Sequence, residues 1–312
     1  MGVAANEAGA GGATGNVALQ FFLPPADLGT CITTFYHTEV SRAGAGVIED
    51  RLHPEWGNLR IMPGGIVDAA IGAGAMERAP HLSLTGPTSL ATRFRHRAGR
   101  SWGIGMLPLG WARLIDVDAS AHADRIHDAG ADPRFAQLHG LVGCLDGSDT
   151  GSVKDLERER TWLADFLQPL MAEPSPREDE IVQMQAVLVH PEIRSVAQLG
   201  AAMGMGLRTL ERFARRYFGF TPQLLLRRQR FVRSLAQFML DPSMRWIDTL
   251  DALYHDQAHF VRDFKRFMIL APSEYAQLEH PVMKAAAKAR QQVVGEAMQV
   301  LHKPGDGAAR PS

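Results

Sequence analysis

The chain lacks much of what several classes of protein need. Its 312 residues include two cysteines, Cys31 and Cys144, too few for a disulfide framework or a four-cysteine zinc site. We expect both to be buried thiols in a reducing cytoplasm. No apolar run approaches the roughly 18 uncharged residues of a transmembrane helix. Residues 1–16 are small and polar without a signal-peptide pattern, so they predict a disordered tail of a cytoplasmic protein without a membrane partner.

Motifs of the common enzyme classes are missing as well. The sequence contains no Gly-x-Ser-x-Gly elbow and no Walker loop. Gly103-Ile104-Gly105 lacks the third glycine and the helix of a dinucleotide fingerprint, so we interpret it as a turn between strands. The first half is rich in histidine, but no His-x-His pair with a following Glu suggests a cupin-type metal site. The sequence therefore predicts no catalytic residues, no cofactor and no metal: a protein that is not an enzyme.

Lysine is absent before Lys154, and the net charge of −1 hides an uneven distribution. Residues 16–150 hold 14 acids against 11 arginines, whereas the stretch from Arg194 to Arg233 holds nine arginines and one acid, Glu211. A basic segment joined to a mildly acidic one is expected when only one half of a protein meets phosphate.

The first two thirds of the chain predict a β-rich domain followed by a helical linker. Between residues 17 and 150, short apolar stretches such as CITTFYHTEV and GIGMLPLGWARLIDV alternate with turn signals made by Gly and Pro. This pattern is typical of a small barrel or sandwich. Residues 151–190 carry apolar side chains at helical spacing, interrupted by Pro174-Ser175-Pro176. The predicted class is α+β, with a barrel- or sandwich-like sensor or dimerisation domain in front of an all-α module.

Residues 191–280 contain two copies of one pattern, a short helix, a turn and a second helix with basic residues. In the first copy Ser195 is a good N-cap, and Gly219 followed by Pro222 ends the second helix. A long helix then connects to the second copy, which spans about Trp246 to Leu270. Residues 281–312 are Ala-rich at first and predict a tail that is helical until Gly305 and disordered beyond it.

These motifs resemble the AraC/XylS family of bacterial transcription regulators. The first part of the resemblance is RTLER at 208–212 with GFTP at 219–222; the second is DQAHF at 256–260, RDF at 262–264 and PSEY at 272–275. The resemblance covers about ninety residues and implies a tandem helix-turn-helix DNA-binding domain. Residues 17–150 look like the sensor domain of one branch of the family. Three departures are Gly206, where a Ser N-cap is usual; Ile269, where the helix usually ends at a glycine and a β-branched residue would be strained; and Asp251 with Leu253, where small residues and a turn glycine are usual.

The recognition helices supply the candidate contacts to DNA. Helical spacing places one set of polar residues on a single face of each second helix, where arginine can read guanine, glutamine can read adenine and Val261 can touch a thymine methyl. The base-reading candidates are Arg208, Glu211, Arg212, Arg215, Gln257, Val261, Arg262 and Lys265. The phosphate-binding candidates are Arg194, Arg216 and Arg266. We favour a structural ion pair for at least one of Arg227, Arg228 and Arg230, and His259 is either a packed capping residue or a DNA contact.

The predicted function is a sequence-specific transcription regulator that reads two successive major-groove segments under the control of its sensor domain. Its expected partners are double-stranded DNA and RNA polymerase, with a small-molecule effector and a homodimer left open. An apolar pocket in this domain lined by Trp56, Trp102 or Trp111 would favour a ligand, and a filled interior would favour dimerisation. The alternative is a small-molecule or metal-binding barrel with a non-specific DNA-binding appendage. A fused DNA-repair methyltransferase, which needs more cysteines, and an architectural DNA binder are further rivals.

Overall fold

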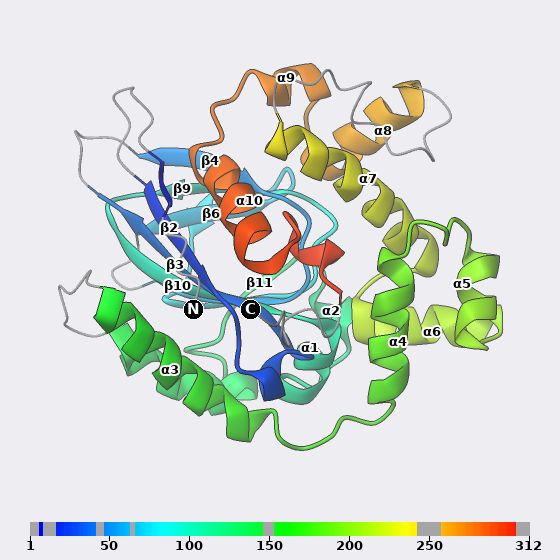
Figure 1. Cartoon of the computed structure of the whole chain (residues 1–312), viewed down its shortest axis with the longest axis horizontal. Helices are drawn as coiled ribbons and strands as arrows, with labels where there is room; N and C mark the ends of the chain where they lie inside the picture. The colour runs from blue at the N-terminus through cyan, green and yellow to red at the C-terminus, as the bar shows by residue number, and fades with distance from the viewer. Residues whose placement is uncertain are drawn as a thin grey trace.

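The computed structural model describes residues 6–8, 17–41, 47–62, 66–145, 153–241 and 257–303. Figure 1 shows two parts side by side, a β-rich domain made by the first half of the chain and a cluster of helices made by most of the second half. The predicted mixed α+β architecture, with a β-rich part followed by helices, is confirmed. No helix in these ranges combines the length and apolarity that crossing a bilayer requires.

Two antiparallel sheets build the β-rich domain. The larger sheet has seven described strands in the order β1-β2-β3-β10-β5-β8-β11, and the smaller has four in the order β4-β9-β6-β7. The strands of the larger sheet are β1 (Asn6–Ala8), β2 (Val17–Phe22), β3 (Ile32–Val40), β10 (Gly99–Met106), β5 (Asn58–Ile61), β8 (Leu82–Thr85) and β11 (Ile126–Asp128). Those of the smaller sheet are β4 (Ile48–Leu52), β9 (Thr92–His96), β6 (Val67–Ile71) and β7 (Glu77–Arg78). Strand β1 pairs with β2 and lies inside the stretch expected to be a disordered tail.

Two local expectations for this domain are wrong. Gly103 and Gly105 lie within β10, paired with β3 on one side and β5 on the other, and do not form a turn. A Cβ at Gly103 would come within 1.9 Å of the Tyr36 ring, so the glycine makes room for that side chain. The apolar stretch that follows is also not a strand, because Pro108 starts helix α1 (Pro108–Leu114) at its first position.

Short helical segments complete the β-rich domain. Besides α1 they are η1 (Ala26–Leu28), α2 (Ala119–His122) and η3 (Pro133–Leu145). The core beneath them is filled by large side chains, among them Trp56, Trp102 and Trp111, each 1% exposed. Cys31 is buried as expected, whereas the side chain of Cys144 lies outside the described part of the structure.

The second half of the chain is helical as predicted. The segment predicted to be a linker contains α3 (Val153–Leu170) and α4 (Glu178–Val189), and the helices that follow are α5 (Val196–Met203), α6 (Leu207–Phe218), α7 (Pro222–Leu240), α8 (Gln257–Met268) and α9 (Pro272–Ala276). In Figure 1, α3 lies beneath the sheet, and α4 to α9 form the cluster beside it. The expected first helix and turn of the second pair, about residues 246–256, lie outside the described residues.

The C-terminal segment differs from the tail that the sequence predicts. Helix α10 (Pro281–Val294) ends at Gly295 in the left-handed conformation (φ 87°), well before the expected end at Gly305, and a short helix η4 (Gln299–Leu301) follows. Helix α10 packs against β2 and β4 of the β-rich domain, and Figure 1 shows it in front of the strands. Asp50 of β4 accepts hydrogen bonds from the N–H groups of Val282 and Met283, which caps the start of this helix.

Buried histidines make the stability of the fold sensitive to acid. Burial lowers the pKa of His37 to about 4, of His53 to about 3 and of His302 to about 4. In the unfolded chain the same histidines take up a proton near pH 6.5. Their contribution to the stability of the fold is therefore complete above that pH and is lost as the pH falls toward the folded pKa values. At pH 5 each group should lower the free energy of unfolding by about 2 kcal/mol.

Urea denaturation at pH 7.5 and pH 5 measures this effect. A His190→Gln control, which removes an exposed histidine, should keep the same pH dependence as the parent chain. An unfolding free energy that is equal at the two pH values would show that these three histidines are protonated in the folded protein.

Candidate nucleic-acid interface and sensor cavity

The first helix pair has the geometry that its sequence predicts. The Ser195 side chain accepts from the N–H of Gln198, and the Gln198 side chain accepts from the Ser195 N–H, which completes a capping box at the start of α5. Gly204 ends α5 in the left-handed conformation, and Gly219 ends α6 in the same way. Gly206 is the N-cap of α6 and provides no side-chain bond, a difference from serine worth only a few tenths of a kcal/mol.

Helix α6 separates a buried face from a charged one. Leu210, Phe213, Ala214 and Phe218 are buried, as expected for the face that holds the helix in place. The four predicted base-reading residues of this helix, Arg208, Glu211, Arg212 and Arg215, are exposed on the other side. Glu211 forms an exposed ion pair with Arg215 at 3.2 Å, a geometry in which this acid can orient the arginine. Their contacts to bases remain a prediction.

Helix α8 presents the second candidate face. Gln257, Arg262 and Lys265 are exposed and Val261 is half-buried, whereas Phe260 and Phe264 are buried as predicted. Ile269 follows the helix with φ 61°. A β-branched residue is strained in this left-handed region, which agrees with the strain expected where the family usually has a glycine.

A buried carboxylate holds α8 to the connecting helix. Asp263 is fully buried and forms ion pairs with Arg227 and, at 3.1 Å, with Arg230 of α7. Arg230 also donates to His259 Nε2 at 3.1 Å, which places this histidine in a packed network. The structural ion pairs favoured for the arginines of the connecting helix are therefore confirmed for Arg227 and Arg230.

The predicted phosphate contacts differ in their surroundings. Arg194 and Arg266 are exposed, and Arg194 lies 3.3 Å from Glu192. Arg216 forms an ion pair at 3.3 Å with Asp116 of the β-rich domain. Arg216 therefore links α6 to the β-rich domain. To bind a phosphate it would have to break its ion pair with Asp116.

The helical module sits directly on the β-rich domain. Arg228 of α7 is fully buried, and its NH1 donates to the carbonyls of Thr88 at 2.9 Å and Glu55 at 3.3 Å. Its guanidinium carbon lies 3.9 Å from the centre of the Trp56 ring. Burial lowers the pKa of Arg228 to about 9, so it stays charged at neutral pH, and the ion pair considered for it from the sequence is absent among the described residues.

Further contacts extend the interface between the helical module and the β-rich domain toward the second helix pair. The Ala91 N–H donates to the carbonyl of Phe267 in α8 at 2.7 Å. His53 Nε2 lies 2.7 Å from the Tyr275 hydroxyl of α9, and His280 Nδ1 lies 3.2 Å from Asp50. Both ends of the helical module thus contact the β-rich domain.

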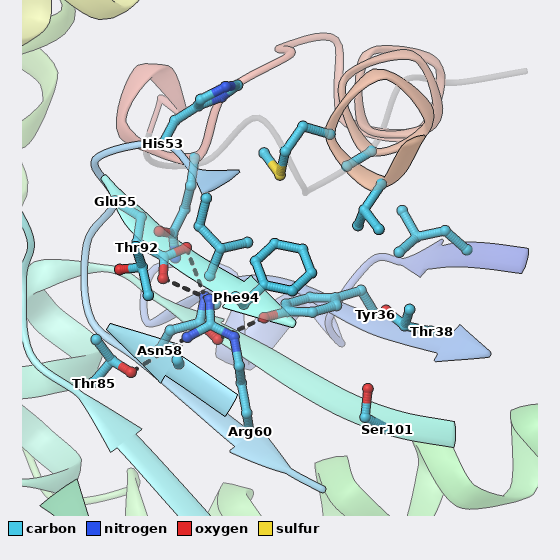
Figure 2. A pocket seen from close by; sticks show the side chains of 18 of the residues that line it. Tyr36, Thr38, His53, Glu55, Asn58, Arg60, Thr85, Thr92, Phe94 and Ser101 are labelled. Carbon is cyan, nitrogen blue, oxygen red and sulfur yellow. Dashed lines mark hydrogen bonds and ion pairs between the residues drawn. The ribbon is translucent and has the colours of Figure 1, made fainter. Parts of the chain in front are cut away.

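The β-rich domain contains a cavity of about 160 Å³ between its two sheets and the C-terminal segment. Figure 2 shows Arg60 near its centre, bonded to Glu55 and Thr85, with Asn58 and Tyr36 beside it. The rest of the lining is mostly apolar and includes Phe94, Met62 and Met298. Helix α10 supplies Val282, Met283, Ala286 and Arg290.

This cavity differs from the pocket considered from the sequence. Trp56, Trp102 and Trp111 fill the core and do not line it. The helix that carries Arg290 is predicted from the sequence, but neither this residue as part of a cavity nor the packing of its helix on the β-rich domain is. The signal was present as Val282, Ala286, Ala289 and Val293, an apolar stripe at helical spacing that needs a surface to pack against.

Comparisons with known proteins identify one region. The model of the helix-turn-helix domain family matches residues 199–277, about a quarter of the chain. This region contains the end of α5, all of α6 and α7, and α8 and α9. No curated protein matches the chain.

Several solved structures are similar in architecture at low identity. ToxT from Vibrio cholerae O395 is 14% identical, with a TM-score of 0.40 over 78% of this chain and 96% of that one. Fatty-acid-bound ToxT from strain SCE256 is 12% identical, with a TM-score of 0.38 over 74% and 91%. The AraC-like activator CuxR is 11% identical, with a TM-score of 0.31 over 75% and 86%. Because these scores are low, the match of residues 199–277 to the helix-turn-helix domain family is the comparison that bears on this chain.

Proposed function

We propose that this chain, whose residues 199–277 form an AraC-type helix-turn-helix domain, is a DNA-binding transcription regulator that reads two successive major-groove segments. The observation that carries the proposal is the repeated helix with a buried aromatic face and an exposed basic or polar face, α6 and α8. Helices of this kind insert their exposed face into the major groove. Two of them in one chain suit half-sites about one helical turn, roughly 34 Å, apart.

The β-rich domain is the proposed sensor. The loop of residues 53–57 borders the cavity on one side and the interface with the DNA-binding module on the other. The Glu55 side chain pairs with Arg60 in the cavity, while the Glu55 carbonyl accepts from Arg228 on the other side. A ligand that moves Glu55 would therefore change a contact of the helix that connects the two readers. Such a shared element gives two sites a coupling free energy.

The remaining parts of the proposal follow from this role. Double-stranded DNA is the proposed partner of both recognition helices, α6 and α8, and RNA polymerase is the proposed partner of the DNA-bound regulator. We propose a small-molecule effector for the cavity, a site of action in the cytoplasm where bacterial DNA lies, and no enzymatic activity. A homodimer would supply a second pair of readers, and sedimentation of the full chain with and without DNA would detect it.

Two arginine variants separate base reading from phosphate binding. Arg212→Ala should weaken binding to the selected site by about 5- to 150-fold, because a bidentate contact to guanine contributes about 1–3 kcal/mol. Its affinity for unrelated DNA should change far less. Arg194→Ala should weaken both to a similar degree and lower the salt dependence by about one unit of slope. Titrations of the full chain at several salt concentrations measure both effects. Equal losses on selected and unrelated DNA for Arg212→Ala would show that it does not read a base.

A further inference from the structure

The charges that line the cavity do not cancel. Among its lining residues the titratable ones are Tyr36, His53, Glu55, Arg60, His96 and Arg290. Burial raises the pKa of Tyr36 to about 12, lowers that of His53 to about 3 and lowers that of His96, so these three are neutral at pH 7. Glu55 and Arg60 form an ion pair at 2.5 Å and neutralise each other. Arg290 therefore leaves the lining with one net positive charge.

Arg290 also lacks the partners that the other polar groups have. Tyr36, Asn58, Glu55 and Arg60 bond to one another. Arg290 is 6% exposed and donates from NH1 to Thr34 at 2.9 Å, while Nε and NH2 have no hydrogen-bond partner in the described structure. Glu55 and Glu296 act on its pKa by charge and the Phe21 ring centre lies 5.9 Å from its guanidinium carbon, but no described carboxylate forms an ion pair with Arg290. Burial lowers the pKa of Arg290 to about 10, so the guanidinium keeps its charge, and an unpaired buried charge is costly.

The size and lining of the cavity limit what can supply the missing anion. A cavity of about 160 Å³ is close to the roughly 150 Å³ that holds benzene in an engineered protein. The lining away from the polar cluster is mostly apolar, with Leu19, Phe21, Val67 and Val282 among its members, and its hydroxyl side chains, such as Thr38 and Ser101, carry no charge. These features suit a compact apolar body that ends in a single negative charge.

We propose that the cavity binds a small monocarboxylate, with its apolar body between the two sheets and its carboxylate paired with Arg290 of α10. A carboxylate matches the planar fork of a guanidinium and can accept two hydrogen bonds from it. The inference rests on the proposed sensor role, for which it names the class of effector, although the binding itself needs no DNA.

This assignment gives the C-terminal helix a regulatory position. Arg290 lies on α10, which follows the helix-turn-helix domain, and not on a strand of the β-rich domain. Helix α10 joins α9 through residues 277–280, where His280 Nε2 lies 2.7 Å from the Tyr275 carbonyl. A carboxylate bound at Arg290 would therefore tie the β-rich domain to the end of the second helix pair.

Calorimetric titration of the full chain with three six-carbon probes tests the proposal. Hexanoate, hexan-1-ol and hexylammonium share one apolar body and differ in charge. We expect hexanoate to bind at least tenfold more tightly than hexan-1-ol, and hexylammonium to bind most weakly. Arg290→Met should remove the preference for hexanoate and leave hexan-1-ol unchanged, whereas Arg290→Lys should restore most of it.

The outcomes separate this inference from the proposed function. Equal binding of hexanoate and hexan-1-ol to the parent chain, or tighter binding of hexylammonium, would overturn it, and this comparison decides even if Arg290→Met does not fold. A preference for hexanoate that survives in a folded Arg290→Met variant would also overturn it. DNA binding is measured separately on the same preparation. Loss of DNA specificity would contradict the proposed regulator, while a hexanoate preference that depends on Arg290 would still establish the carboxylate site.

Discussion

An Asp263→Ala variant should bind only the first half of a two-part DNA site. Asp263 is fully buried between α7 and α8 and holds Arg227 and Arg230. Removing it leaves two guanidinium groups without their buried partner, which should destabilise this helix pair by about 3–5 kcal/mol. Helix α8 would then lose its position, and with it the contacts expected from Gln257 and Arg262. The affinity for the full site should fall about a hundredfold, because each lost base contact contributes about 1–3 kcal/mol.

Footprinting of the full chain on its selected site measures this loss directly. Protection should disappear over one half-site and persist over the half read by α6. The control is Glu157→Ala, which breaks an ion pair with Arg160 in the linker helix α3 at a partly exposed position and should cost less than about 1 kcal/mol. Full protection of both half-sites by Asp263→Ala would show that α8 keeps its position without this carboxylate.

An Arg228→Met variant should separate the sensor from the DNA-binding module without removing either. Methionine keeps much of the apolar stem but cannot donate to the carbonyls of Glu55 and Thr88. It also loses the contact with the Trp56 ring. Amide exchange in α7 and in residues 53–57 should become at least tenfold faster, because these segments would no longer hold each other. Any effect of an effector on DNA affinity, typically 5- to 150-fold in coupled sites, should largely disappear.

Hydrogen exchange and DNA titration of the same preparations check this prediction. Arg233→Met is the matched control, since Arg233 lies on the same helix and is only half-buried. Exchange in α3 should be unchanged in both variants. Arg228→Met protein with the exchange rates and effector response of the parent chain would show that coupling passes elsewhere, for example through His53 and Tyr275.

The helix-turn-helix module could be predicted largely from local signals. Ser195, Gly219 and Pro222 mark the ends of helices by capping and backbone preference, which depend on a few neighbouring residues. The period of 3.6 residues then separates the buried Phe213 from the exposed Arg212 without knowledge of the fold. The mixed architecture followed in the same way from turn signals and strand-like stretches in the first half.

The cavity and the interface between the helical module and the β-rich domain could not be predicted from local signals. Arg228 and Arg230 lie two residues apart on one helix, yet one contacts the β-rich domain and the other contacts Asp263. Trp56 looked like a candidate pocket residue because an aromatic side chain suits both a pocket and a core. The Ala-rich C-terminal segment looked like a tail, because its partner surface on β2 and β4 lies more than 200 residues away in the chain.

The measurement that most directly tests the central claim is selection of genomic DNA fragments by the full chain at two salt concentrations. The account predicts a recurring site made of two short elements about one helical turn apart, recovered at both concentrations. Uniform recovery of fragments that collapses at the higher salt would contradict it, because the arginines would then hold only phosphate.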